Sequence, residues 1–429
     1  MRKLPGEKGT LTRNQSLWEQ LGPGLVTGAA DDDPSGIATY SQVGAAFGYS
    51  LLWTALFTWP LMVGIQMVCA RIGRVSGNGI AANMRLYSSR WLLYGAVGML
   101  LIANTINIAA DIGAMGAALK LLIGGPAQLY AIFFGVASLA LQVLVPFPRY
   151  APFLKSLTLA LFAYVGTVFI VKVPWGDVLY RSVVPDVSFN VQYVVAIVAV
   201  FGTTISPYLF FWQASQEVEE QRASPDEQPL TAAPEQAERN LRRIKTDTYI
   251  GMAFSNLIAF FIILTAAVTL HAHGLTNVAT SAQAAEALRP VAGPFAFFLF
   301  AAGIVGTGLL AVPVLAGSAA YAVAEAFDWR IGLGRRLRQA RGFYCILAIA
   351  TLLGVALNFT PVDPIRALFW SAVINGVIAV PIMVIVMLLS ARSEVMGDFV
   401  VIGRLRMLGW AATAVMAVAV IVMLATWGA

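Results

Sequence analysis

Long apolar runs recur along almost the whole chain, and they constrain its fold more than any other feature. They begin near residue 21, continue to the C-terminus, and are separated by short polar segments. A run of roughly 20 apolar residues can cross a hydrocarbon core of about 30 Å as a helix. We therefore expect about eleven spans, near 21–47, 51–72, 91–122, 127–146, 154–172, 191–215, 248–270, 291–326, 343–358, 366–390 and 407–427.

The composition supports an all-α polytopic membrane protein. Hydrophobic residues make up 59% of the 429 residues and charged residues only 12%, whereas roughly a quarter of an ordinary soluble domain is charged. The apolar runs show no period of two, so we expect helices rather than the strands of a barrel.

Other classes of protein find little support in the sequence. The net charge of +6 comes from Lys and Arg residues between the apolar runs, so no nucleic-acid partner is expected. Cys69 and Cys345 lie in or beside apolar stretches, which supports neither a disulfide framework nor a zinc cluster. No nucleotide-binding loop or nucleophile–base pair is visible, so we expect no enzymatic activity and no cofactor.

Basic residues alternate between successive predicted loops, and this alternation predicts the orientation. They cluster at the N-terminus and after the second, fourth, sixth, eighth and tenth spans, while the opposite loops carry single residues such as Arg181 and Arg289. Cytoplasmic loops carry the excess of Lys and Arg. We therefore expect a plasma-membrane (inner-membrane) protein with a cytoplasmic N-terminal segment at 1–20, a cytoplasmic helical connector at about 213–247, and an external C-terminus.

The first span is interrupted by three consecutive carboxylates, Asp31, Asp32 and Asp33, followed by Pro34 and Gly36. A charged Asp at a helix centre costs about 2.5–3.5 kcal/mol even on the most lenient insertion scale, so such residues normally face a cavity or a cation. Proline and glycine favour unwinding, which frees carbonyl oxygens to join a carboxylate as hard ligands. The alternative is that the three residues lie at the membrane surface, before a shorter helix.

The sixth span has a similar interruption, in which Gly202, Thr203, Thr204 and Ser206 precede Pro207 within an apolar run. Proline removes an amide donor and clashes with the preceding turn, so local unwinding is expected. Taken alone, the motif is equally compatible with a simple kink. Breaks in the first and sixth spans together are typical of inverted five-helix repeats, in which they surround a substrate site near the bilayer midplane.

From Gly22 to Trp53, the segment GPGLVTGAADDDPSGIATYSQVGAAFGYSLLW resembles the first two helices of the Nramp family of divalent metal transporters. The resemblance extends over nearly the whole membrane domain. It implies a LeuT-like fold in one transport domain, 21–427, with two inverted repeats, about 21–172 and 191–390, and an extra helix at about 407–427.

The resemblance also implies a set of metal ligands. In the family, the first broken helix carries Asp-Pro-Gly-Asn, whose Asp and Asn coordinate the metal together with a carbonyl three residues before the Asp. The equivalent positions here are Asp33, Gly36 and Ala30. Glycine therefore stands where typical members have a coordinating asparagine.

The sixth span departs from the family in the same direction. Typical members carry Ala-x-x-Met followed by Pro-His, whereas this stretch starts at Thr203, has Ser206 in place of the methionine and Tyr208 in place of the histidine. A thioether favours transition metals, while oxygen ligands suit hard ions. A roomier, all-oxygen site suits Mg²⁺, which dehydrates reluctantly. The chain thus resembles the magnesium-transporting branch of Nramp-related proteins.

Much of the family's proton route is missing. Typical members keep two acidic residues three positions apart on the third helix, near the sixth-helix histidine; here Asp111 takes one position and Ile108 the other. Asp111 and Tyr208 are candidates for a proton or gating relay, but a buried acid with a structural hydrogen bond is an equal alternative for Asp111. On the tenth span, Asn375 lies one turn from the position that is usually a glutamine.

Three functional hypotheses follow. The first is a secondary transporter that imports Mg²⁺ and Mn²⁺ as partly hydrated ions by alternating access, without strong proton coupling. The second is a proton-coupled Mn²⁺/Fe²⁺ symporter, and the third is a sensor or scaffold without flux. In the first, Asp33 is the main charged ligand, Ala30 and Thr203 offer carbonyls, and Asp32, Ser206 and Asn375 hold coordinated waters. The expected partners are the divalent cation and the lipid bilayer; the sequence does not indicate an oligomeric state.

Overall fold

The computed structural model describes residues 22–145, 149, 158–188 and 190–427, and helix is the only regular structure within these residues. The N-terminal segment 1–20, predicted to be cytoplasmic, lies outside the described residues, as do parts of the first, fourth and fifth predicted spans. The all-α architecture predicted from the apolar runs is confirmed.

The helices follow the predicted spans. The first half of the chain forms α2 (Pro23–Asp31), α3 (Pro34–Phe47), α4 (Leu52–Ser76), α6 (Arg90–Ile123), α7 (Ala127–Leu144) and α9 (Phe162–Ile170), which follows a 3₁₀ turn at Thr158–Leu161. The second half forms α11 (Val191–Thr204), α12 (Pro207–Ala223), α13 (Ala237–Thr269), α16 (Ala296–Ala326), α17 (Arg341–Leu357), α18 (Pro364–Ser390) and the final α20 (Gly403–Trp427).

By length and composition, eight helical stretches of the described residues can cross a membrane. Two further predicted spans are shorter apolar helices, Leu159–Ile170 and Arg341–Leu357. The first span is the broken pair α2 and α3, each of which is too short to qualify alone. The structure therefore contains both predicted broken helices, as the first and the sixth span along the chain.

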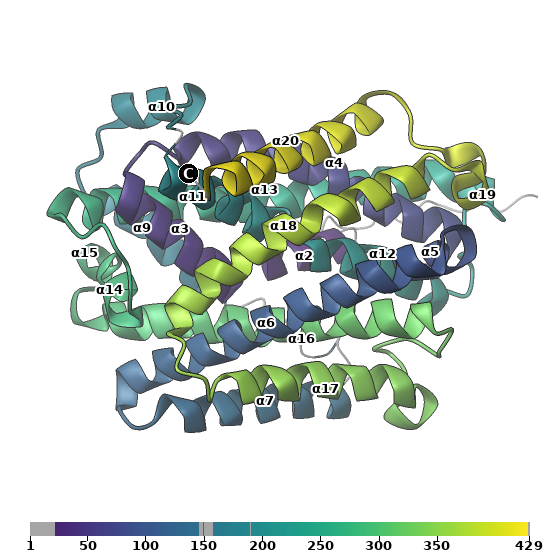
Figure 1. The fold of residues 1–429 in the computed structure, drawn as a ribbon, viewed down its shortest axis with the longest axis horizontal. Coiled ribbons are helices and arrows are strands. Elements are labelled where there is room, and N and C mark those ends of the chain that lie inside the picture. The colour runs from purple at the N-terminus through teal and green to yellow at the C-terminus, as the bar shows by residue number, and fades with distance from the viewer. Residues whose placement is uncertain (1–21, 146–148, 150–157, 189, 428–429) are drawn as a thin grey trace, which may run out of the picture.

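Short helices mark the two ends of the molecule (Figure 1). At one end lie α5 (Ile80–Tyr87), α19 (Ser393–Met396) and the C-terminus of α12; we call it the basic end because it carries Arg85, Arg222, Arg239 and Arg392. At the opposite end lie α10 (Trp175–Val183), α14 (Ser281–Glu286) and α15 (Arg289–Ala292). Short 3₁₀ turns complete the connections at Pro234–Gln236, His271–His273, Gly293–Phe295, Leu337–Gln339 and Gly397–Phe399.

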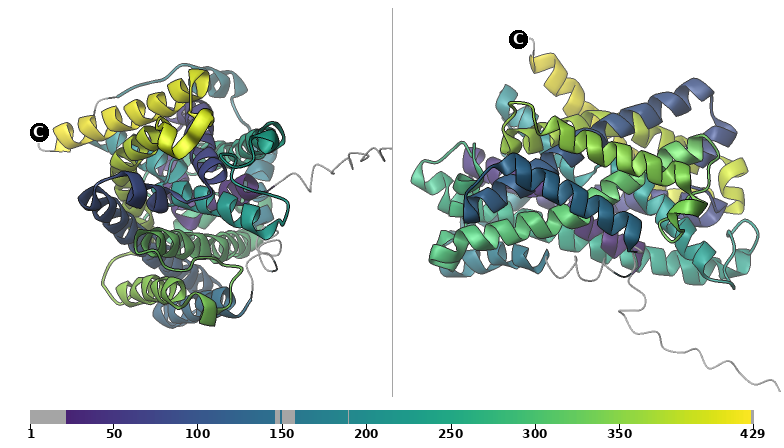
Figure 2. Two further views of the ribbon diagram at one scale, coloured as in Figure 1. Left: turned by 90° about the vertical axis from the view of Figure 1, so that its right-hand side faces the viewer. Right: turned by 90° about the horizontal axis from the view of Figure 1, so that it is seen from below.

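The broken helices occupy the interior and the apolar helices surround them. α13 packs along both α2 and α3, α11 packs on α18, α12 on α4, and α6 on α16. α7 and α17 pack on each other at one edge of the molecule (Figure 2). Their outward side chains, such as Phe133 and Leu352, are large, apolar and exposed, as expected for helices that face lipid.

Glycines permit backbone contacts that set the positions of the broken helices. A Cβ atom on Gly202 of α11 would lie 2.0 Å from the Ala372 carbonyl oxygen of α18. A Cβ atom on Gly28 of α2 would lie 2.2 Å from the Gly251 carbonyl oxygen of α13. Both distances are far below a van der Waals contact, so only glycine fits at these two crossings.

The predicted connector at about 213–247 is largely part of the two helices that it joins. α12 continues to Ala223 and α13 begins at Ala237, leaving a turn region at about 224–236. The Glu and Arg residues that marked this segment as a polar connector pair with each other along the helix ends, so their charges do not end the helices early.

The crossing of α11 and α18 generates a stability prediction. Gly202→Ala should destabilise the protein by about 1–3 kcal/mol, because overpacking against a rigid backbone forces the helices apart. Thermal unfolding of the purified protein in detergent measures the effect. The matched control is Gly98→Ala on α6, where a Cβ atom meets nothing within 4 Å; equal melting temperatures for the two variants would contradict the crossing.

Candidate metal site

The first break is formed by three residues with three different roles. Asp31 ends α2, Asp32 follows it, and Asp33 is the N-cap of α3, where its Oδ1 accepts the Gly36 amide N–H at 2.7 Å. Pro34 occupies the first position of α3, where its missing donor costs nothing. All three carboxylates are buried, with exposed fractions of 0%, 1% and 2%. They therefore do not lie at an exposed surface of the molecule.

The second break separates α11 from α12 at Ile205 and Ser206, with Pro207 at the first position of α12. The Ser206 hydroxyl donates to the Gly202 carbonyl at 2.6 Å and lies 3.0 Å from the Thr203 carbonyl oxygen. Ser206 is therefore turned back onto the end of α11. The Ser206 hydroxyl bonds to a carbonyl of α11, and Pro207 begins α12, so only Ile205 and Ser206 separate the two helices.

The two breaks meet at Tyr208. Its hydroxyl lies 3.1 Å from the Ala30 carbonyl oxygen and 3.4 Å from Asp33 Oδ2. Gly36 is beside Thr203, because a Cβ atom on Gly36 would lie 3.4 Å from Thr203 Oγ1. Four of the predicted ligand positions are thus brought together from α2, α3 and α11.

Two further predicted residues come from other helices. Asp111 on α6 is fully buried, interacts electrostatically with Asp33, and lies beside the Ser35 amide without a hydrogen bond of normal geometry. Asn375 on α18 is buried and its Oδ1 has no hydrogen-bond partner. Ser35 fixes α3 to α18 by donating to the Leu368 carbonyl at 3.0 Å.

Asp32 lies with Asp31 and away from Tyr208. The Ser255 hydroxyl of α13 is 2.5 Å from Asp31 Oδ2 and 3.2 Å from Asp32 Oδ1. Ser255 was absent from the residues predicted from the sequence, although a polar residue within the apolar run at 248–270 was an available signal. The three consecutive carboxylates therefore face two different helices.

The donors around the break limit how a cation is held. Within the described residues, no three His, Cys, Asp or Glu side chains converge to form a metal-binding group. A cation beside Asp33 would depend on one or two carboxylates, on carbonyl and hydroxyl oxygens, and on water. Such a donor set suits a hard ion.

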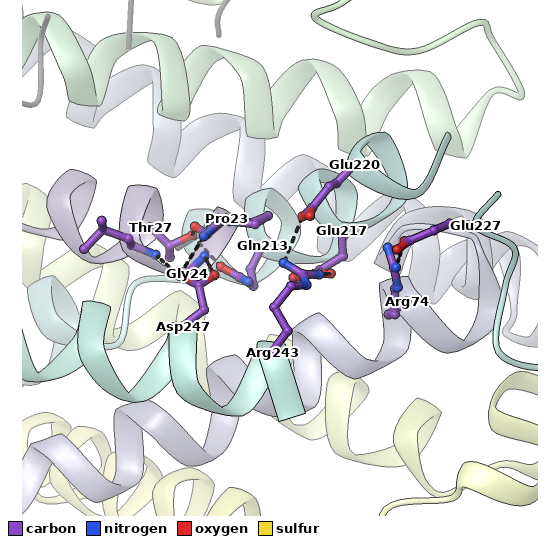
Figure 3. Close-up of polar contacts among 12 residues, drawn as sticks. Pro23, Gly24, Thr27, Arg74, Gln213, Glu217, Glu220, Glu227, Arg243 and Asp247 are labelled. Carbon is purple, nitrogen blue, oxygen red and sulfur yellow. Dashed lines mark hydrogen bonds and ion pairs between the residues drawn. The ribbon is translucent and has the colours of Figure 1, made fainter. Parts of the chain in front are cut away.

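Polar contacts among α2, α12 and α13 close the molecule toward the basic end (Figure 3). The Asp247 carboxylate of α13 accepts the amide N–H groups of Gly22, Gly24 and Leu25 at 2.6–3.0 Å, which caps the start of α2. One turn earlier on α13, Arg243 pairs with Glu217 at 2.5 Å and Glu220 at 2.9 Å on α12. Both α2 and α12 are thus fixed to α13.

A single stripe of α13 makes all of these contacts. Arg243, Asp247, Gly251 and Ser255 follow one another at four-residue intervals, a spacing that places them on the same helix face. In order, they contact α12, the start of α2, the middle of α2, and the carboxylates at its end. Sequence analysis did not identify these partners.

The opposite end is hollow. A cavity of about 840 Å³ lies between α3, α11 and α18, and Gln42, Val195 and Phe369 are among the residues that line it. Ala38, two residues beyond Gly36 and about one turn beyond the start of α3 at Pro34, also lines the cavity. The cavity therefore extends from the opposite end to within about one helical turn of the first break.

The described helices, with two broken spans around a buried polar centre, define a multi-pass membrane protein with a LeuT-like fold. The chain resembles a mutant of the Eremococcus coleocola manganese transporter, with a TM-score of 0.72 and 16% identity over 97% of this chain and 94% of that one. It also resembles MhsT in complex with L-phenylalanine, with a TM-score of 0.62 and 12% identity over 94% of this chain and 98% of that one.

The sequence comparisons agree on the family. The model described as natural resistance-associated macrophage protein-like, Nramp, matches residues 24–426, so the chain belongs to the Nramp family. The divalent metal cation transporter MntH of Deinococcus radiodurans is 28% identical over 91% of this chain and 86% of its own length. MntH of Klebsiella pneumoniae is 26% identical over 92% and 91%. These relatives are transporters, which agrees with the prediction that the chain is not an enzyme.

The closed basic end generates a prediction about access. Asp247→Ala removes the acceptor of three amide hydrogen bonds at the start of α2. A hydrogen bond to a charged group contributes about 1.5–3 kcal/mol. The equilibrium for separation of α2 from α13 should therefore shift at least about tenfold toward the separated state. Labelling of Ala29→Cys by a membrane-impermeant thiol reagent, in a Cys345→Ser background, measures this opening; the remaining Cys69 is buried.

The matched control is Asp328→Ala, which removes an exposed acid that pairs with Arg85 at the same end. It should leave the labelling rate unchanged. Equal labelling of the two variants would show that Asp247 does not hold α2 in place.

Proposed function

We propose that the chain moves a divalent metal cation through the plasma membrane by alternating access, with Asp33 as its principal charged ligand. The observation that carries the proposal is the Tyr208 hydroxyl, which lies 3.1 Å from the Ala30 carbonyl oxygen and 3.4 Å from Asp33. Ala30 and Asp33 thus direct two oxygens of the first break at one point beside the second break. The relatives named as divalent metal cation transporters support the same substrate class.

We further propose Mg²⁺, with Mn²⁺ as a second substrate. The donors nearest the two breaks are oxygens: the Asp33 carboxylate, the Ala30 and Thr203 carbonyls, and the Tyr208 hydroxyl. No methionine stands at Ser206, so no thioether favours a transition metal there. Gly36 contributes no side chain to fill the site, and in this proposal Ser206 and Asn375 bind waters of a partly hydrated ion.

The proposed transport is not strongly coupled to protons. Ile108 stands where typical family members have an acid, and Tyr208 stands where they have a histidine. A tyrosine hydroxyl has a reference pKa near 10, so it is a poor proton carrier at neutral pH compared with histidine. In this proposal, Tyr208 orders the Ala30 and Asp33 oxygens before the ion arrives.

We place the basic end in the cytoplasm, with the N-terminal segment inside and the C-terminus outside, because excess Arg and Lys mark cytoplasmic loops. The cavity between α3, α11 and α18 then opens to the exterior, and the contacts of Asp247 and Arg243 close the cytoplasmic side. Ions would enter through the cavity and leave after α2 separates from α13.

One observation favours the alternative of a proton-coupled Mn²⁺ symporter. Asp111 is a buried acid beside Asp33 with no hydrogen bond of normal geometry, so it retains the chemistry of a proton relay. Uptake into liposomes separates the two proposals. We expect Mg²⁺ uptake that does not change with an imposed pH gradient; acid-stimulated Mn²⁺ uptake that excludes Mg²⁺ would support the symporter.

The proposed ligand gives a direct test. Asp33→Ala should abolish Mg²⁺ uptake, since it removes the charged group that faces Tyr208, while Asp31→Ala should have a milder effect because Asp31 faces α13. Initial rates in liposomes containing equal amounts of folded protein make the comparison. Wild-type uptake by Asp33→Ala would exclude Asp33 as the ligand.

A further inference from the structure

Asp31 and Asp32 are buried carboxylates at the first break that the proposed transport site does not use. Asp33 faces Tyr208 of α12, whereas Asp31 and Asp32 share the Ser255 hydroxyl of α13. A hydroxyl has one proton, so Ser255 can donate to only one of the two carboxylates at a time. The other carboxylate then lacks this donor.

The surroundings of the pair do not compensate its charge. Asp31 Oδ1 and Asp32 Oδ2 are buried and have no hydrogen-bond partner. Among the residues that the structure describes, no Lys, Arg or His forms an ion pair with either carboxylate. Both acids also stand at the C-terminal end of α2, where the helix dipole is negative. Neither an ion pair nor the end of α2 therefore compensates the charge of the two acids.

A second, independent side chain points to the same place. Tyr40 of α3 is 1% exposed, interacts electrostatically with both Asp31 and Asp32, and lies near Thr204. Its hydroxyl forms no hydrogen bond of normal geometry. Burial of a hydroxyl without a partner is unfavourable in proteins, and this hydroxyl lies close enough to Asp31 and Asp32 to interact with their charge. Both features fit a cation bound near the two carboxylates.

We propose that Asp31 and Asp32, with the Ser255 hydroxyl, bind a second divalent cation, separate from the transported ion at Asp33. The donors are all hard oxygens, which suits Mg²⁺ or Ca²⁺. Two carboxylates carry a charge of −2 in a low-dielectric interior, and a divalent ion neutralises it fully. Because Asp31 and Asp32 also interact electrostatically with Asp33, the charge of this second ion would reduce the attraction of Asp33 for the transported ion.

The test is the number of Mg²⁺ ions bound by the full-length protein purified in detergent, determined by equilibrium dialysis and elemental analysis at saturating Mg²⁺. We expect two ions for the wild type, one for Asp31→Asn and one for Asp33→Asn. Asp177→Asn, an acid in α10 far from the break along the chain, is the control and should bind two. One ion in the wild type, or two in Asp31→Asn, would overturn the proposal.

Ser255→Ala keeps both carboxylates and guards against misfolding of the Asp31 variant. It should weaken binding of one ion several-fold and leave the affinity for the other unchanged; two unchanged affinities would contradict a ligand role for Ser255. In crystals soaked with Mn²⁺, two anomalous peaks are expected, one between α2 and α13.

This inference shares with the proposed function only the assignment of Asp33. If Asp33→Ala still transports, the proposed function fails, whereas transport with a single bound ion defeats this inference alone.

Discussion

Burial of three adjacent carboxylates is the constraint on which the rest of the structure depends. A low-dielectric interior strongly disfavours unpaired charge, so each carboxylate needs hydrogen-bond donors or a cation. The break supplies donors by ending one helix and starting another: Asp33 accepts the Gly36 amide N–H, and the Ser255 hydroxyl donates to Asp31 or Asp32, one at a time. The close glycine crossings and the cap on α2 then hold the half-helices that create this geometry.

Much of the fold could be predicted because its signals are local. Apolar runs of membrane-spanning length fix the helices, and Pro34 and Pro207 fix the two breaks within one or two residues, because proline at the first helical turn is a strong boundary. The contact between the breaks followed from their equivalent positions in two repeats. The ends of α12 and α13 were harder to predict, since their charged residues are neutralised by partners on another helix.

The orientation of side chains at the break could not be predicted. Asp31 and Asp32 lie where regular winding stops, so helical periodicity no longer relates one residue to the next. The partnerships of Asp247 with Gly24, and of Ser255 with Asp31, join residues more than 220 positions apart. A single sequence carries no local signal for such pairs, which is why α13 was predicted as an ordinary span.

The four-residue spacing along α13 has a mechanical consequence. A row of contacts at i, i+4 and i+8 forms a ridge inclined to the helix axis, with about 6 Å between successive positions. The residues of this row on α13 differ in kind, so a shift of α2 by one turn does not find an equivalent set of contacts. On leaving its position, α2 would lose its amide acceptor and its glycine crossing at the same time. Release of α2 should therefore be an all-or-none step with a sharp barrier, rather than a gradual tilt.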